Sequence, residues 1–236
     1  MSEIKYGGFF NSPEENQEPI ETKAYVQERV KFAEDIRKLF WLSIAALVTT
    51  VLNSFSIFSG LCNIVNIGCG IFTLVIFFRM CKLIEEYKKA AVLQIAVVVM
   101  AVVAVVVGVI AELSIGGGVI IATIVVIIAA IVSLYAVYYE FQGHNTILSG
   151  IDNELAEKWN ALWTWTIISF VGSVIGGFIS AMLPILGILI VLAVAVLAIW
   201  VSVMKVIYLK KMADLFEDLS VKCERAIKEA AEAELE

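Results

Sequence analysis

Charged side chains are scarce in this 236-residue sequence. Asp, Glu, Lys and Arg make up 17% of it, whereas a soluble globular chain carries about 25%. Hydrophobic residues make up 61%, and the mean hydropathy is +0.92. They come in unbroken runs rather than at the helical or strand period of a soluble domain. We therefore expect the lipid bilayer, and not water, to surround most of the chain.

Residues that commonly carry chemistry are also few. The single histidine, His144, lies in segment 141–145, which we expect to be a cytoplasmic loop with Glu140 as the neighbouring acid. The four cysteines are Cys62, Cys69, Cys81 and Cys223. Their spacing matches neither CxxC nor a Cys/His metal site. Phosphate-binding loops, HExxH and nucleophile elbows do not occur either, so we expect no enzyme, metal site or cofactor.

Two further absences narrow the class of protein. The net charge is −6 and the sequence has no long basic block, which argues against nucleic acid as a partner. The chain does not begin with basic residues followed by an apolar core, so no cleavable signal peptide is expected. Residues 1–23 contain proline, paired glycine and several acids, and we predict a disordered cytoplasmic tail there.

Six apolar stretches are long enough to cross a bilayer as helices, which takes roughly 20 residues. They are residues 39–59, 61–80, 91–111, 119–139, 161–183 and 184–205. Short breaks with Gly or Pro separate the members of each consecutive pair, as in tight turns between antiparallel helices. The sequence thus predicts an all-α polytopic membrane protein, with three helical hairpins within residues 39–208.

The basic residues predict the orientation of these helices. All 17 Lys and Arg residues lie on one side of the predicted bundle: before the first span, at or after the end of the last, or at the end of the second span and in the two connections between hairpins. Arg79 and Lys205 are the last-turn residues of their spans. Cytoplasmic loops carry such an excess, so both termini are expected in the cytoplasm. The three opposite turns contain one charged residue, Glu112.

Three amphipathic stretches flank the predicted spans. Residues 24–38 form one amphipathic cytoplasmic helix, and residues 152–163 form a second. No Gly or Pro follows Gly187, so the sixth helix is predicted to continue through a cytoplasmic segment, residues 209–236. Stripes of this kind lie on the membrane surface or pair with another helix, and the sequence leaves both alternatives open.

Parts of the chain look duplicated. Residues 79–86 (RMCKLIEE) and 211–218 (KMADLFED) share a basic residue, Met, Leu, an apolar residue and two acids in the same order. The runs 154–163 (ELAEKWNALW) and 208–212 (YLKKM) resemble segments of small uncharacterised bacterial multi-pass membrane proteins with helical-hairpin repeats. That resemblance implies a location in the bacterial inner membrane and carries no activity or site residues.

A few polar or small residues inside or beside the spans are candidates for a function. Asn53 and Asn66 can face each other across the first hairpin, where packing and a polar permeation path are the alternatives. Glu112, just beyond the third span, is either a cation or proton site at an outer mouth or a solvated turn residue. Gly172, Gly176 and Ser180 have the spacing of close helix contact, either within the chain or between subunits.

Two functions follow from these features. The first is a non-enzymatic scaffold or accessory protein whose cytoplasmic helices contact a protein partner, another copy of the chain or the membrane surface. The second is a small oligomeric transporter or channel with Asn53, Asn66 and Glu112 near the path. The near absence of ionisable residues inside the spans favours the first, because coupled transport commonly uses them.

Overall fold

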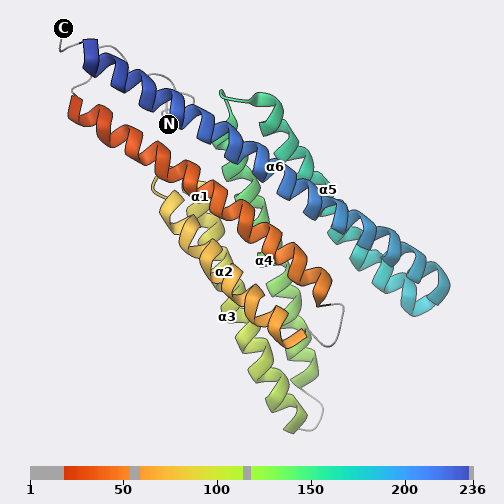
Figure 1. Cartoon of the computed structure of the whole chain (residues 1–236). Helices are drawn as coiled ribbons and strands as arrows, with labels where there is room; N and C mark the ends of the chain where they lie inside the picture. Colours follow the sequence, from red (N-terminus) through yellow and green to blue (C-terminus); the bar gives the residue numbers. More distant parts are fainter. Residues whose placement is uncertain (1–18, 54–58, 114–117, 234–236) are drawn as a thin grey trace, which may run out of the picture. The chain divides into compact units, whose positions relative to one another are not determined.

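All regular structure in the described part of the chain is helical. The computed structural model describes residues 19–53, 59–113 and 118–233. The six helices are α1 (Pro19–Leu52), α2 (Ser59–Met80), α3 (Glu85–Leu113), α4 (Gly118–Leu148), α5 (Asn153–Met182) and α6 (Pro184–Ala233) (Figure 1). Five of them, α2 to α6, are long and apolar enough to cross a membrane. The predicted first span, 39–59, includes residues 54–58, which lie outside the described residues. The chain is therefore an all-helical protein of the multi-pass membrane type.

The helices divide into two compact units. Unit 1 comprises Met1–Thr73 and Asn145–Glu236, and unit 2 comprises Leu74–His144. Unit 1 thus holds α1, α5 and α6 with most of α2, whereas unit 2 holds α3 and nearly all of α4. The two units carry different sets of buried side chains, and each is described separately below.

In unit 1, α6 packs against both α5 and α1. The turn between α5 and α6 is short because Pro184 takes the first position of α6, where its missing N–H costs no hydrogen bond. The N–H of Leu183 donates to the carbonyl oxygen of Ile179 at 2.7 Å and closes α5. Just beyond this turn, a Cβ atom added to Gly187 would lie 2.3 Å from backbone atoms of Ser180. Glycine is therefore what lets the two helices approach so closely here.

In unit 2, a short turn joins the end of α2 to α3. The Phe77 ring of α2 stacks on the Tyr87 ring of α3, with centroids 5.6 Å apart. Met80 and Ile84, on either side of the turn, are almost fully buried. The corresponding residues of the second sequence copy, Met212 and Phe216, are also buried. The duplicated motif buries equivalent positions, but it forms a turn after α2 and continuous helix within α6.

Helix boundaries differ from the predicted ones in two places. Helix α1 already begins at Pro19, although a tail to residue 23 was expected; residues 1–18 lie outside the described residues. Helix α4 continues through segment 141–145, where a loop was expected, whereas the start of α5 at Asn153 agrees with the amphipathic helix predicted over residues 152–163. The sequence has no proline between positions 19 and 184, so polar composition alone did not end these helices.

The true break between α4 and α5 is short and has two identifiable causes. Gly150 adopts a φ of 90°, a conformation that glycine takes without steric cost. The Asp152 side chain then accepts a hydrogen bond from the N–H of Leu155 at 2.9 Å and caps α5. The predicted continuation of the sixth helix is confirmed, because α6 runs unbroken for 50 residues.

Candidate functional site

The charged parts of α1 and α6 lie side by side in unit 1 and run in opposite directions (Figure 1). On α1, the side chains of Phe32, Ile36 and Leu39 are 0–3% exposed. Their spacing of four and three residues places them on one face of a helix. Between them Asp35 is also buried, at 6% exposure. This face of α1 is therefore covered by protein.

Helix α6 contributes the matching face. Its buried side chains follow steps of three and four residues: Leu209, Met212, Ala213, Phe216, Ser220 and Cys223. The Phe216 ring meets the Phe32 ring of α1 edge to face, with centroids 5.0 Å apart and planes at 86°. Such a seam resembles the contact line of an antiparallel coiled coil. We call these two buried faces together the α1–α6 seam.

Charged residues border the α1–α6 seam. Arg37 Nη1 lies 2.7 Å from Glu217 Oε1, and both side chains are about half exposed. Lys38 Nζ reaches Glu34 at 3.1 Å and Asp35 at 3.8 Å within α1. Exposed ion pairs of this kind contribute about 0–1 kcal/mol each. The apolar packing, rather than the ion pairs, therefore stabilises the seam.

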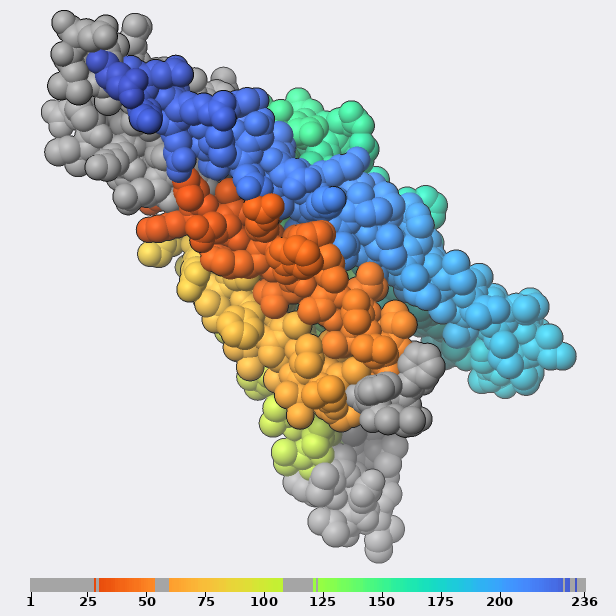
Figure 2. Space-filling view, viewed as in Figure 1, coloured from red at the N-terminus to blue at the C-terminus, as the bar shows by residue number. Residues whose placement is uncertain are grey.

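The amphipathic start of α5 also packs against α6. Leu155, Trp159 and Leu162 are 0–4% exposed. The Trp159 ring contacts the Tyr208 ring of α6, with centroids 5.9 Å apart and planes at 69°. The sequence had left open whether these stripes face the membrane or another helix. In the structure α1, α5 and α6 each bury an apolar face in this region, and in the space-filling view the surfaces of α1 and α6 meet along the charged part of α6 (Figure 2).

The small residues of α5 lie against α6. A Cβ atom on Gly172 would come within 2.8 Å of a Val194 methyl group, and one on Gly176 within 3.0 Å of an Ile190 methyl group. Ser180 contacts Gly187, and its hydroxyl donates to the Gly176 carbonyl at 2.8 Å. All three candidate packing residues therefore lie at the contact between neighbouring helices of the same chain.

The candidate polar residues fall in different units, Asn53 and Asn66 in unit 1 and Glu112 in unit 2. Asn66 is half-buried, and its Oδ1 accepts a hydrogen bond from the hydroxyl of Thr49, on α1. Asn53 directly follows α1 and is exposed. Glu112 lies near the end of α3, in unit 2, and its side chain is outside the described residues. The first-hairpin pairing therefore involves Thr49, which the sequence analysis did not consider as a partner of Asn66.

A buried polar cluster in unit 2 is absent from the sequence analysis. Tyr87 and His144 are fully buried, Glu140 is 5% exposed, and the Tyr87 hydroxyl lies 2.8 Å from His144 Nδ1. The four-residue spacing of Glu140 and His144 would have revealed their shared helix face, but only if α4 had been extended past residue 139. Tyr87 lies 57 residues away, and no sequence pattern pointed to it.

Neither unit shows an assembled centre for metal chemistry in its described residues. No three His, Cys, Asp or Glu side chains among them are placed to share a metal ion. None of the four cysteines forms a disulfide bond among the described residues, and Cys62 and Cys223 are buried. No protein-family model, curated protein or solved structure matches the chain.

Proposed function

We propose that the chain is a scaffold or accessory protein of the bacterial inner membrane, without enzymatic activity. In this proposal six helices cross the membrane as three hairpins, and both termini lie in the cytoplasm. The paired helices of the α1–α6 seam then form a cytoplasmic arm that contacts a protein partner. The observation that carries the proposal is the continuity of α6 from an apolar segment into a charged one, over 50 residues.

A continuous helix supports a mechanical link between membrane and cytoplasm. The apolar part of α6 packs on α5, and its charged part packs on α1. A helix rises 1.5 Å per residue, so the residues after Lys205 reach about 40 Å beyond the predicted end of the last span. Because the seam buries Phe32, Ile36, Met212 and Phe216, this arm is supported by packing along much of its length.

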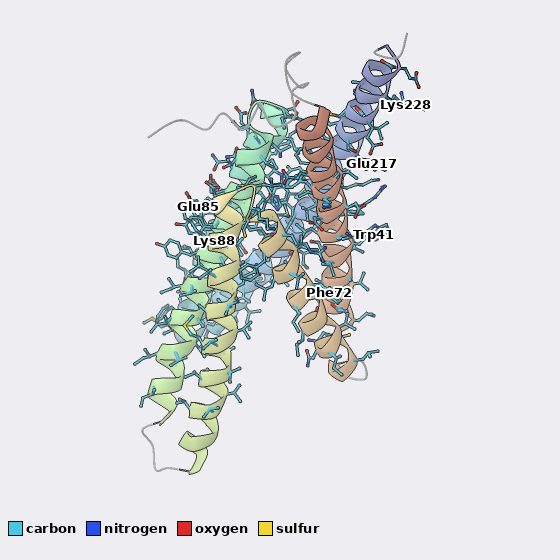
Figure 3. All side chains as sticks on the ribbon, turned by 90° about the vertical axis from the view of Figure 1, so that its left-hand side faces the viewer. Trp41, Phe72, Glu85, Lys88, Glu217 and Lys228 are labelled. Atoms are coloured by element: carbon cyan, nitrogen blue, oxygen red, sulfur yellow. The ribbon has the colours of Figure 1, made fainter. Side chains whose placement is uncertain are left out.

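Burial of the apolar faces supports a protein, rather than the membrane surface, as the partner of the cytoplasmic arm. A helix that lies on a membrane inserts an exposed apolar face, whereas Phe32, Ile36 and Phe216 are buried in the protein. The outward faces of the charged parts of α1 and α6 are mostly polar. Their exposed charged residues include Glu34, Arg37, Lys210, Glu217, Asp218, Lys222 and Glu224, and Figure 3 shows Glu217 and Lys228 on the charged part of α6. Such a surface fits a polar interface of moderate affinity.

A pull-down from gently solubilised native membranes tests the proposal. Tagged full-length chain is compared with the chain truncated after Lys211, with Phe216→Ala and with Val221→Ala. Phe216 is fully buried in the seam, whereas Val221 is 39% exposed on the same helix. We expect a partner at near one-to-one stoichiometry that is lost on truncation, weakened by Phe216→Ala and retained by Val221→Ala.

If all four forms are recovered without a partner, the scaffold proposal is wrong. The alternative of a small oligomeric transporter or channel would then be tested by flux into liposomes that contain the purified protein. Transport that Glu112→Ala abolishes would support that alternative. Transport that neither Glu112→Ala nor Asn66→Ala changes would place the path elsewhere in the chain.

A further inference from the structure

The polar cluster of unit 2 joins α3 to α4 through a histidine. Tyr87, on α3, and His144, on α4, are both fully buried. The Tyr87 hydroxyl oxygen lies 2.8 Å from His144 Nδ1, and Glu140 Oε1 lies 4.0 Å from His144 Nε2. His144 is therefore in contact with a hydroxyl on one side and near a carboxylate on the other. No part of the scaffold proposal uses these residues.

The donor and acceptor of the Tyr87–His144 hydrogen bond depend on the histidine tautomer, and we assign Tyr87 as the donor. A phenol with an ordinary pKa near 10 keeps its proton at neutral pH, so it can donate to an unprotonated ring nitrogen. With Tyr87 donating to Nδ1, the ring proton of a neutral His144 sits on Nε2, on the side of Glu140. Among the described residues, His144 is the one hydrogen-bond partner of the Tyr87 hydroxyl. Neutral His144 therefore satisfies this buried hydroxyl and links the two helices.

We propose that His144 is a proton-binding site, and that its protonation loosens the contact between α3 and α4. The imidazole takes up one proton from water, at Nδ1, and both ring nitrogens become donors. The Tyr87 hydroxyl must then turn to accept from Nδ1, and its own proton loses this acceptor inside the protein. An unpaired buried donor is costly, so the protonated state favours separation of the two helices. This site lies in unit 2 and goes beyond the proposed function.

Other charged groups of unit 2 decide how readily the proton is taken up. Glu140 favours the protonated ring, and burial opposes it. Glu86, next to Tyr87, has a carboxylate oxygen that is buried without a hydrogen-bond partner among the described residues. Lys89 Nζ forms an ion pair with Glu85 Oε1 at 3.2 Å and lies over the Tyr139 ring. Arg79, on α2, is exposed. Acidic groups thus lie close to the cluster, and acidic neighbours favour the protonated imidazole.

Close packing makes a small movement at Tyr87 consequential. A Cβ atom on Gly143 would lie only 2.8 Å from Cε1 of the Tyr87 ring. The Tyr87 ring is also contacted by Phe77, whose ring stacks on it at an interplanar angle of 28°. A tyrosine held between two helices in this way cannot reorient without displacing one of them. Protonation of His144 is therefore expected to change the packing of α2 as well as that of α3 and α4.

The sole histidine of the chain permits a direct test on the unmodified protein. Full-length protein with ¹⁵N-labelled histidine in lipid nanodiscs gives one pair of imidazole signals, whose shifts report the protonation state of His144 between pH 8 and pH 5. Hydrogen exchange of residues 85–90 and 140–148 is measured over the same range and corrected for the intrinsic effect of pH. We expect His144 to protonate within this range, with exchange rising about tenfold or more at the same midpoint.

Substitutions separate a proton site from a purely structural cluster. Tyr87→Phe removes the bond that favours neutral His144, so the titration midpoint should rise. Glu140→Gln removes the charge that favours protonated His144, so the midpoint should fall. Tyr135→Phe makes the same change as Tyr87→Phe at a position of α4 that is 56% exposed, and it should leave the midpoint unchanged.

Three results would overturn this inference. His144 that stays in one protonation state from pH 8 to pH 5 is not a proton switch. Protonation without any change in exchange would show that the contact between α3 and α4 does not respond. Midpoint shifts of the same sign in Tyr87→Phe and Glu140→Gln would contradict the assigned roles. None of these results depends on a partner of the α1–α6 seam, so this inference and the scaffold proposal can fail independently.

Discussion

Replacing Phe216 with alanine should open the α1–α6 seam while leaving the apolar helices in place. The Phe216 side chain is fully buried, and its ring contacts Phe32 edge to face at 5.0 Å. Removing the ring deletes this contact and leaves a cavity between the two helices. Apart from Leu39, at the start of the predicted first span, the seam residues lie outside the predicted spans, so the expected change is local to the charged parts of α1 and α6.

The magnitude follows from burial and ring contact. Burying a phenylalanine side chain contributes about 1.5–3 kcal/mol, and an aromatic pair adds about 0.5–1.5 kcal/mol. Measured Phe→Ala changes in well-packed cores cost about 3–5 kcal/mol. We expect about 3 kcal/mol here, at the lower end of that range. At about 1.4 kcal/mol per tenfold change, the open state of the seam becomes more than a hundredfold more populated.

Limited trypsin cleavage and hydrogen exchange measure this opening. Trypsin cuts after Lys and Arg, and α1 presents Lys31, Arg37 and Lys38 on its exposed face. In Phe216→Ala we expect cleavage and exchange of residues 28–39 to accelerate by about two orders of magnitude. Val221→Ala, on the exposed face of α6, should change them less than threefold. Equal rates in the two variants would refute the seam.

Other substitutions have smaller or differently placed effects. Gly187→Ala forces a methyl group against the backbone of α5 and should clearly lower the thermal unfolding temperature in detergent. Gly177 has open space around it, so Gly177→Ala should leave that temperature unchanged. Similar unfolding temperatures for the two variants would contradict the close α5–α6 contact. Asp152→Ala removes the cap of α5 and should cost about 1 kcal/mol, seen as faster exchange in its first turn and unchanged exchange elsewhere. Arg37→Ala breaks the half-exposed pair with Glu217 and should cost less than 1 kcal/mol; a loss as large as that of Phe216→Ala would show that charge, not packing, stabilises the seam.

Much of the helix content was predictable because it depends on local properties. Length and apolarity identify α2 to α6, and the lack of Gly and Pro after Gly187 predicts the unbroken α6. The predictions were less successful where polar residues continue a helix. Segment 141–145 was expected to be a loop because it contains Gly143, His144 and Asn145, but tertiary burial of His144 against Tyr87 keeps it helical. Packing overrode a weak local preference there.

The sequence by itself determined that most of this protein is surrounded by lipid. Runs of about 20 uncharged residues favour the bilayer because the free energy of transferring an apolar side chain out of water depends on the surface area of that side chain alone. Only the tertiary structure decided what covers the amphipathic stripes and which polar groups meet. A stripe shows that one face of a helix must be covered, but lipid and another helix satisfy that need equally well. The Phe32–Phe216, Thr49–Asn66 and Tyr87–His144 contacts join residues far apart in the chain, and they form because of how whole helices pack.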